Sequence, residues 1–572
     1  MGAFTKVWRT KWRSHASSKQ QQGRLHWLMI ALLIVGIGFR FGAINRKIYW
    51  HDEVYTSMRA AGFTRQEIDA ELFQNHFVAA PTLQKFQQIK PGSTYGNTLH
   101  SLITEDPQHP PLYFWMARFW MQQFGSSILA SRLLPVFISL LSLPLIYGLA
   151  MELFASQLTA LLAMGLLALS PFDILFAQTA RQYSLLTVIV LASSWLLLRA
   201  MRCSGWRFWI GYGLSVAAGF YTHPFFALTL LVHGAYVLAI GLLQPEQLQS
   251  EQYSESDHAA DSFRPSAEQI SPINWLSRQI WRFGFAVVGS LILYSPWIWV
   301  IVRQYKRAAA TTDWTNTIVP FSYLLKLWTL SFSSLFIDLD FGFSNPLTFG
   351  LRIPFVLLVL AALYRIYRHP VLQVRLFVLL TALLPFLLLI IPDLVMGGKR
   401  STVSRYLISC YPGIQLAVAS LLSHKLVQGK VFWRGVLGFT IVSSLISCSV
   451  SALSNSWWNK DLSYHNAEVV QLINAATEQR ESSLAPVLIS DMGDDSTNMG
   501  DLISISYQLK PEVNLFLVSQ PPKFMTLGDP TGAFVFRASQ SLQTAIAEQG
   551  WQTKPISHPA RLWQIEAKRS SN

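Results

Sequence analysis

Residues 45–63 read NRKIYWHDEVYTSMRAAGF and place two adjacent carboxylates, Asp52 and Glu53, directly after an apolar run. An apolar run of about 20 residues is long enough to cross a lipid bilayer. The two acids therefore stand where a membrane span has just ended. Such a pair belongs either to an ordinary solvated loop or to a catalytic site, and the remainder of the chain favours the catalytic site.

The composition is typical of a membrane protein. The chain has 572 residues, of which 51% are hydrophobic and 13% are charged, whereas an average soluble chain is roughly 25% charged. The formal net charge of +14 does not indicate nucleic-acid binding, because the lysines and arginines lie in short loops between apolar runs. Basic loops of this kind orient membrane helices, and we expect membrane lipids as partners.

The first membrane span sets the orientation. Residues 1–24 are basic and polar, and they precede an apolar run at 25–44 that has the length of a span and no small-residue cleavage site. The sequence therefore predicts an uncleaved anchor in an inner or plasma membrane, with a cytoplasmic N-terminus. Asp52 and Glu53 then emerge on the outer, periplasmic face, in a first outer loop at residues 45–130.

The lengths of the apolar runs and the distribution of Lys and Arg together predict about eleven spans. If the short segment 109–125 crossed the membrane, the basic loops that begin at Arg199, Tyr364 and Ser423 would all face outward, against the positive-inside rule. We therefore expect an interfacial helix there. A second interfacial helix is expected at 320–336, because an extra crossing there would move the later loops to the opposite side of the membrane. The predicted spans are 25–44, 131–150, 157–173, 184–200, 207–221, 224–243, 283–302, 350–366, 372–392, 406–423 and 433–452.

The remaining segments complete the predicted architecture. Residues 244–281 are rich in Gln, Ser, Glu and Asp without an apolar period, and we expect a flexible cytoplasmic linker there. Residues 453–572 alternate four short apolar runs, APVLIS, VNLFLVS, AFVFRA and LWQIEA, with helical stretches, which predicts a small periplasmic α/β domain. The predicted fold is an α-helical polytopic membrane protein, with a transmembrane domain at 25–452, interfacial helices in the first outer loop and this C-terminal domain.

Several cations lie on the outer side in this topology, where the positive-inside rule does not expect them. Each abuts the outer end of a span: Arg181, Arg303, Lys399, Arg400 and Arg405. Arginine near a membrane is costly and is kept where it has an anionic partner, and its planar fork suits a phosphate. For any single residue, the alternative is snorkelling toward lipid headgroups. Their gathering on the face that carries Asp52 and Glu53 indicates chemistry on a lipid phosphate.

The location restricts the donor. An enzyme on the outer face of a bacterial inner membrane meets neither ATP nor nucleotide sugars, so its donor must arrive within the membrane. A polyprenyl phosphate sugar fits this requirement. A carboxylate would remove the proton of an acceptor hydroxyl as that hydroxyl attacks the anomeric carbon, and cations would stabilise the charge that develops on the departing phosphate.

Seven motifs occur in an order that resembles one known superfamily. They are HDEVYTSMRAAGF, HPPLYFWMARFWMQQFG, SRLLPVFISLLSLPLIYGLAMELF, LLALSPFDILFAQTARQYSLLTVIVLAS, GFYTHPFFALTLL, YSPWIWVI and SRYLISCYPGIQLAVASLL. This order is similar to that of the GT-C superfamily, in its protein mannosyltransferase and aminoarabinose transferase branch (glycosyltransferase family 39-like). The resemblance implies a transmembrane catalytic domain of GT-C type, a dolichyl or undecaprenyl phosphate sugar as donor, and inversion of the anomeric centre. A hexose or pentose would pass to a hydroxyl of a lipid, glycan or protein.

The resemblance also implies roles for particular residues. It makes Asp52 the general base, with Glu53 beside it to position the acceptor or the base. His109 occupies a position at which relatives can carry a cation. The expected contacts to the lipid phosphate are Arg181 with Tyr183, Arg405 with Tyr406, and, from their charge, Lys399, Arg400 and Arg303.

Two further polar residues have alternative interpretations. Asp173 either caps the helix that follows Pro171 or lines the site. His223 is either a polar anchor at the interface or a substrate contact. Trp50 and Trp314, on the outer side, are candidates for stacking on a sugar ring.

No metal site is assigned from the sequence. Cys203, Cys410 and Cys448 lack metal-ligand or paired spacing. The run DMGDDSTNMGD, from Asp491, lacks the spacing of an EF-hand, and we expect a solvated loop. The acid pair at the start of the first outer loop leaves open whether a divalent cation assists.

The alternative class is a transporter or flippase of a lipid-linked glycan, which would also have many spans and buried cations. Transporters often contain an internal repeat and place polar sites near the bilayer midplane, whereas here no repeat is found and the polar residues gather at one face. A receptor-like binding protein, a third class, leaves the outward arginines unexplained.

Overall fold

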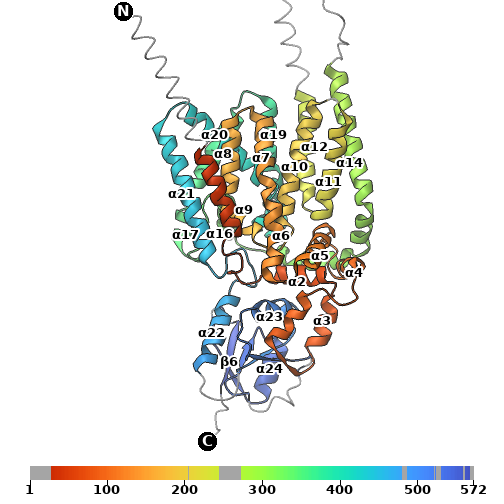
Figure 1. Cartoon of the computed structure of the whole chain (residues 1–572), viewed down its shortest axis with the longest axis vertical. Helices are drawn as coiled ribbons and strands as arrows, with labels where there is room; N and C mark the ends of the chain where they lie inside the picture. Colours follow the sequence, from red (N-terminus) through yellow and green to blue (C-terminus); the bar gives the residue numbers. More distant parts are fainter. Residues whose placement is uncertain are drawn as a thin grey trace, which may run out of the picture.

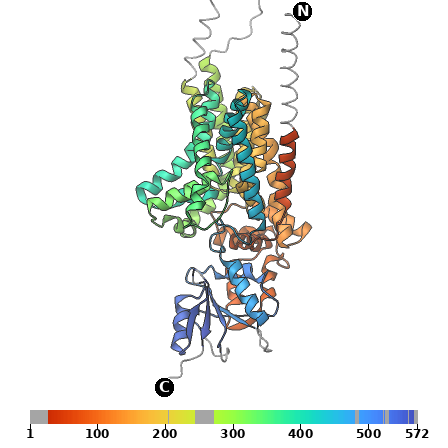
Figure 2. The ribbon, with the colours of Figure 1, turned by 90° about the vertical axis from the view of Figure 1, so that its left-hand side faces the viewer.

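The structure is a computed structural model that describes residues 27–203, 205–243, 272–479, 486–520, 522, 530–557, 559 and 561–566, without the side chains of 272–277. The predicted N-terminal region 1–24 and the linker residues 244–271 lie outside the described residues. The described parts form a helical bundle with a mixed α/β domain at one end (Figure 1). The view turned by 90° shows the same arrangement (Figure 2).

Each of the eleven predicted spans falls on a helix or helix pair of the bundle. Within the described residues, seven are long and apolar enough to cross a membrane: α6 with α7 (Ile128–Leu140, Ser142–Phe154), α10 (Tyr183–Arg202), α12 (Phe226–Leu243), α14 (Pro272–Arg303), α17 with α18 (Pro346–Gly350, Ile353–Tyr367), α19 (Leu372–Met396) and α21 (Val431–Leu453). The bent pair α8 and α9 would be an eighth. The other three predicted spans correspond to shorter helices: Trp27–Phe41, α11 (Trp206–Thr222) and α20 (Tyr411–Val427).

The span predicted at 157–173 is not one straight helix. α8 (Gln157–Ala168) and α9 (Pro171–Ala177) meet at 56°. Pro171 has no backbone N–H and disfavours a helical conformation in the residue before it, so the helix breaks at that point. The Ser170 hydroxyl accepts the N–H of Asp173 and caps the new helix.

The linker predicted to end at residue 281 ends earlier in the structure. α14 begins at Pro272 and runs for 32 residues, so the prediction is wrong for residues 272–281. Proline is favoured in the first turn of a helix, and the bulky apolar residues that follow Pro272 continue the pattern of the span.

Two short helices occupy the segments predicted to be interfacial. α5 (Leu112–Phe124) and α16 (Phe321–Ser333) have 13 residues each, which corresponds to about 20 Å, less than the roughly 30 Å of a hydrocarbon core. Arg118, in the middle of α5, is buried and donates to the carbonyls of Ala60 and Ser93. Its charge therefore faces protein and not lipid.

A six-stranded sheet forms the centre of the α/β domain, in the order β1-β3-β2-β4-β6-β5. β2 pairs in parallel with β3 and β4, and the other pairs are antiparallel. The four predicted strands are β2 (Val487–Ser490), β3 (Asn514–Leu517), β4 (Phe534–Phe536) and β6 (Leu562–Glu566), and β5 (Gln552–Pro555) was not predicted. The helices of this part are α22 (Asn466–Gln479), α23 (Asn498–Ser506) and α24 (Gln540–Glu548).

The predicted first outer loop is part of this domain. It supplies β1 (His76–Ala79), which pairs with β3 from His76 opposite Leu517 to Ala79 opposite Asn514. It also supplies α2 (His51–Ala61), α3 (Arg65–Leu72), η1 (Ala80–Gln87) and α4 (Tyr95–Glu105). Val54 and Met58 of α2 share a hydrophobic core with the sheet residues Leu488 and Leu515. Residues 453–572 are therefore not a separate unit.

Candidate active site

α2 places Asp52 and Glu53 at the junction of the helical bundle and the α/β domain (Figure 1). Both lie in the first turn of α2, where the helix dipole favours negative charge. Their environments differ, because the Asp52 side chain is 20% exposed whereas Glu53 is fully buried. The two acids therefore cannot act alike.

The Glu53 carboxylate is held by five hydrogen bonds. Arg132 binds it through two N–H groups at 2.8 Å, and the backbone N–H groups of Ala180 and Trp50 donate at 2.8 and 2.9 Å. Lys460 donates at 3.1 Å. Burial raises the pKa of Glu53, but Arg132 and Lys460 more than offset this and bring the pKa to about 2. This geometry favours a positioning role over proton transfer.

Arg132 and Lys460 were not identified from the sequence. Besides Glu53, Arg132 binds the carbonyls of Ile44, Lys47 and Ile48, in the backbone that leads into α2. The available signal for Arg132 was its position near the start of an apolar run, because an arginine there is costly without a partner. Lys460 follows the last span and gave no signal of its own.

The Asp52 carboxylate has a neighbour at each oxygen but remains partly exposed. The His51 Nε2 atom lies 3.0 Å from Oδ1, and Nη2 of Arg181 lies 3.8 Å from Oδ2. Burial raises the pKa of Asp52, but the imidazole of His51 and the guanidinium groups of Arg181 and Arg405 lower it by more, so the pKa lies below its ordinary value. Asp52 is therefore an ionised carboxylate at neutral pH.

His109 helps to orient Arg181. Its Nε2 lies 3.2 Å from Nη2 of Arg181, and its Nδ1 lies 2.8 Å from Oδ1 of Asp106. Because arginine can only donate, Nε2 of His109 accepts and Nδ1 carries the proton that it donates to Asp106. Arg59 pairs with Asp106 at 3.0 Å. The structure thus places His109 against Arg181.

A chain of ring contacts continues from Arg181. The guanidinium carbon of Arg181 lies 5.7 Å from the centroid of the Tyr183 ring, and the ring centroids of Tyr183 and His223 are 6.2 Å apart. Two residues after His223, Phe225 stacks on Tyr406 with centroids 4.1 Å apart. This chain of contacts therefore links both predicted phosphate-contact tyrosines and His223 to Arg181.

Arg405 lies in a group of aromatic side chains. Its guanidinium carbon is 5.3 Å from the Trp50 ring, 5.7 Å from Trp314 and 5.7 Å from Tyr406. Its closest acid is Asp461, at 3.7 Å. Trp50 is fully buried, so the prediction that it stacks on a sugar is wrong, whereas Trp314 remains 39% exposed.

The other predicted cations are less closely joined to this group. Lys399 lies over the Trp314 ring at 5.4 Å. Arg400 pairs with the buried Asp393 at 3.2 Å, which satisfies its charge locally. Arg303 is exposed at the end of α14, and no contact among the described residues joins it to the group.

Asp173 lies apart from Asp52. Its carboxylate accepts a hydrogen bond from Gln415 at 2.9 Å, while Ser170, and not Asp173, supplies the cap of α9. Together with Arg40 it lines a polar cavity of about 10 Å³, which has room for about one water molecule.

The segment 455–463, here called the connector, joins α21 to the α/β domain and completes the site. Its contacts are the Asn455 carbonyl with the Ile48 N–H, the Trp457 and Trp458 indoles with Asp338, Lys460 with Glu53, the Asp461 carbonyl with the Trp50 indole, and the Ser463 hydroxyl with the His51 N–H. No local pattern in the sequence indicates this role, because each contact joins residues far apart in the chain.

The acidic run that begins at Asp491 is the predicted solvated loop only in its middle, where Asp494 and Asp495 are exposed. Asp491 and Asp501, at its two ends, are fully buried. Asp501 accepts hydrogen bonds from Ser463, Arg561 and the Arg537 guanidinium. Asp501 therefore links the connector to Arg537 and Arg561, which flank β4 and β6.

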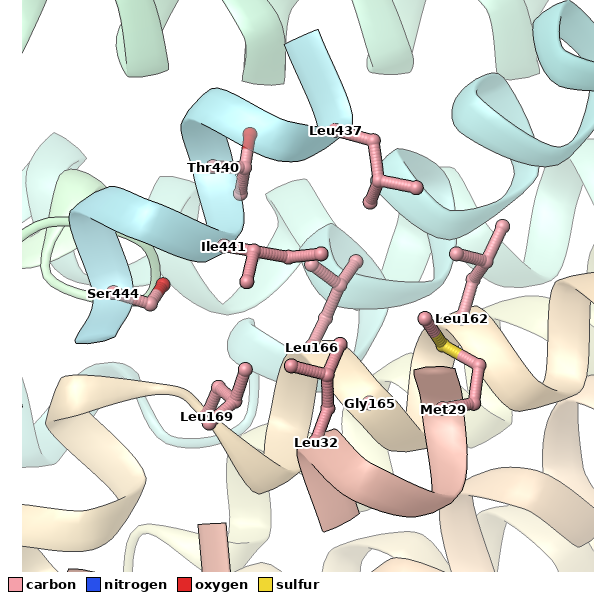
Figure 3. A pocket seen from close by; sticks show the side chains of 10 residues that line it. All are labelled: Met29, Leu32, Leu162, Gly165, Leu166, Leu169, Leu437, Thr440, Ile441 and Ser444. Carbon is pink, nitrogen blue, oxygen red and sulfur yellow. The ribbon is translucent and has the colours of Figure 1, made fainter. Parts of the chain in front are cut away.

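No group of three or more His, Cys, Asp or Glu side chains in the described part of the chain is arranged to hold a metal ion. The cavity in Figure 3 lies between the helix Trp27–Phe41, α8 and α21, is lined mostly by aliphatic side chains such as Leu32, Leu166 and Ile441, and measures about 10 Å³. It holds at most a water-sized group and does not contact Asp52.

Comparisons with known proteins agree with this architecture. The family model of the dolichyl-phosphate-mannose-protein mannosyltransferases matches residues 108–250. The crystal structure of ArnT from Cupriavidus metallidurans bound to undecaprenyl phosphate is 14% identical, with a TM-score of 0.50 over 96% of this chain and 98% of that chain. No curated protein sequence matches the chain.

Two further solved structures are similar to a lesser degree. The apo state of ArnT from the same organism is 12% identical, with a TM-score of 0.49 over 95% of this chain and 98% of that chain. The oligosaccharyltransferase of Archaeoglobus fulgidus, tethered with an acceptor peptide, is 12% identical, with a TM-score of 0.43 over 86% of this chain and 64% of that chain. The family-model match and the ArnT-like fold confirm the resemblance to the GT-C superfamily of membrane glycosyltransferases that the order of the motifs predicts.

Proposed function

We propose that this protein transfers a sugar from a polyprenyl phosphate to a hydroxyl group of a lipid, glycan or protein acceptor, with inversion, on the outer face of the membrane. The proposal rests mainly on one observation. Asp52, an ionised and partly exposed carboxylate, lies beside Arg181, while Arg405 lies close enough to lower the pKa of Asp52. A base and two phosphate-binding cations are the groups that such a transfer requires.

The helices around the site support phosphate binding. α10, α12 and α20 each begin shortly after a residue of the site, namely Arg181, His223 and Arg405. Their N-termini therefore all face this end of the bundle, and helix N-termini attract phosphate through free N–H groups and the helix dipole. ArnT, which shares the fold, was crystallised with undecaprenyl phosphate, which favours a lipid of this class as the donor.

The transfer then proceeds in one displacement. The acceptor O–H bond breaks as its proton passes to Asp52, and the oxygen forms a bond with the anomeric carbon. The bond from that carbon to the phosphate oxygen breaks, and its electron pair leaves with the polyprenyl phosphate. Arg181 and Arg405 stabilise the charge on the leaving phosphate, while Glu53, held by Arg132 and Lys460, fixes the start of α2.

The function is tested by following the leaving group. Purified protein in lipid nanodiscs is incubated with a panel of undecaprenyl and dolichyl phosphate sugars and a membrane extract as acceptor source, and free polyprenyl phosphate is measured by mass spectrometry. We expect release from at least one donor, which would also name the sugar. Folded protein that binds a donor but releases none would contradict the proposal, and flipping of a labelled lipid would then test for a flippase.

Donor affinity tests the phosphate site separately. Arg405→Ala is expected to weaken donor binding by about 10- to 100-fold, since a hydrogen bond to a charged group contributes roughly 1.5–3 kcal/mol. Binding of a fluorescent donor analogue in nanodiscs measures this change. Arg303→Ala is the matched control, because it removes an arginine that the structure places outside the group. Unchanged affinity in Arg405→Ala would count against the phosphate site.

A further inference from the structure

The residue before the acid pair is bound to the catalytic carboxylate. The His51 Nε2 atom lies 3.0 Å from Oδ1 of Asp52, and the two side chains are 12% and 20% exposed. Adjacent residues on a helix normally point in different directions. The contact here depends on the position of His51 as the first residue of α2.

Several neighbours fix the His51 ring. It lies edge-on between Trp50 and Tyr55, with centroids at 5.8 and 6.0 Å and planes at 85° and 88°. Its backbone N–H donates to the Ser463 hydroxyl at 3.0 Å. A Cβ atom at Gly500 would lie 2.8 Å from the Tyr55 ring and 3.4 Å from Cβ of His51, so α23 packs tightly against this side of α2.

The hydrogen bond between His51 and Asp52 has a defined direction. An ionised carboxylate can only accept, so the proton of this contact lies on Nε2 of His51, which donates it to Oδ1 of Asp52. Nδ1 of His51 is buried and has no hydrogen-bond partner among the described residues, so the side chain makes its one polar contact with Asp52.

We propose that His51 is a positioning residue for the general base. By binding Oδ1 it holds the Asp52 carboxylate in one rotamer and leaves Oδ2, which faces Arg181 at 3.8 Å, to take the acceptor proton. This inference rests on the proposed function. In the step itself the acceptor O–H bond breaks and its proton moves to Oδ2, while the hydrogen bond from His51 to Oδ1 is retained.

Two amide substitutions separate positioning from packing. In His51→Gln the side-chain amide reaches the place of Nε2 and can donate to Asp52, whereas in His51→Asn the amide is too short to do so. We expect kcat in His51→Asn to fall by about 100-fold, because a misplaced catalytic group costs about that much. His51→Gln should remain within about tenfold of the wild-type protein.

The measurements are polyprenyl phosphate release, which gives kcat and KM, and binding of the fluorescent donor analogue, which shows whether each variant is folded. KM for the donor and its binding constant should stay within about threefold in both variants. His51→Phe also removes the hydrogen bond to Asp52, but it keeps an aromatic ring between Trp50 and Tyr55. It should behave like His51→Asn.

Each result of these measurements either supports or overturns the positioning role of His51. Wild-type kcat in His51→Asn or His51→Phe would overturn the positioning role, as would an equal loss in His51→Gln and His51→Asn with donor binding retained. In both cases the wild-type protein still transfers sugar, so the proposed function stands. A wild-type protein that binds the donor and releases no polyprenyl phosphate would overturn the proposed function and this inference together.

Discussion

Asp52→Asn is expected to lower sugar transfer by about 10³-fold, since a general base typically contributes roughly 10²- to 10⁴-fold. Asparagine has the shape of the carboxylate but cannot accept the proton of the acceptor hydroxyl. Asp52 is the acid of the pair that is suited to this task, because its carboxylate is partly exposed whereas that of Glu53 is saturated by hydrogen bonds. Release of polyprenyl phosphate measures the effect.

Donor binding should respond differently to the same substitution. Asp52 lies 3.8 Å from Arg181, so the neutral asparagine removes a negative charge from the neighbourhood of the phosphate. Donor affinity should therefore be unchanged or slightly higher. Asp494→Asn is the control, because Asp494 is exposed in the α/β domain. Turnover near the wild-type rate in Asp52→Asn would contradict the assignment of the base.

The spans and the outward-facing arginines could be identified from local patterns. Hydropathy over about 20 residues and the position of basic loops are sufficient to find spans and to orient them. Arg181 and Arg405 stood out because they broke the orientation rule, and the structure places both close to Asp52. Arg303 broke the same rule but is exposed at the end of α14, so the rule alone does not show which cations lie close to Asp52.

The part of the site that was missed depends on distant contacts. Lys460 binds Glu53 across 407 residues of sequence, and β1 joins a sheet whose other strands begin at Val487. Neither contact leaves a periodic pattern in the sequence. The burial of Asp501 was missed for the same reason, because its partners include Arg537 and Arg561, 36 and 60 residues away.

The connector joins the start of α2 to the α/β domain. Lys460 binds the buried carboxylate of α2, and Ser463 binds both the His51 backbone and Asp501 of the α/β domain. The small α/β domain that the sequence predicted at 453–572 is therefore bound directly to the helix that carries Asp52.

Glu53→Ala is expected to be the most destabilising single substitution at the site. It leaves the buried guanidinium of Arg132 and the buried ammonium of Lys460 without their anion, and breaking a buried ion pair in this way costs about 3–5 kcal/mol. The measurement is the thermal unfolding midpoint of the purified protein in nanodiscs. Glu71→Ala, which removes an acid from an exposed pair with Lys85, should change stability by less than about 1 kcal/mol.

A double substitution distinguishes the effect of an unpaired buried charge from the effect of lost side-chain packing. If the unpaired charge is the cause, Arg132→Met combined with Glu53→Gln should be more stable than the sum of the two single changes predicts, because both members of the pair are then neutral. Lys460 would still lack a partner, so recovery should be partial. Strict additivity of the two single effects would show that Glu53 and Arg132 stabilise the start of α2 independently, and would contradict the buried pair as the element that holds Asp52 in place.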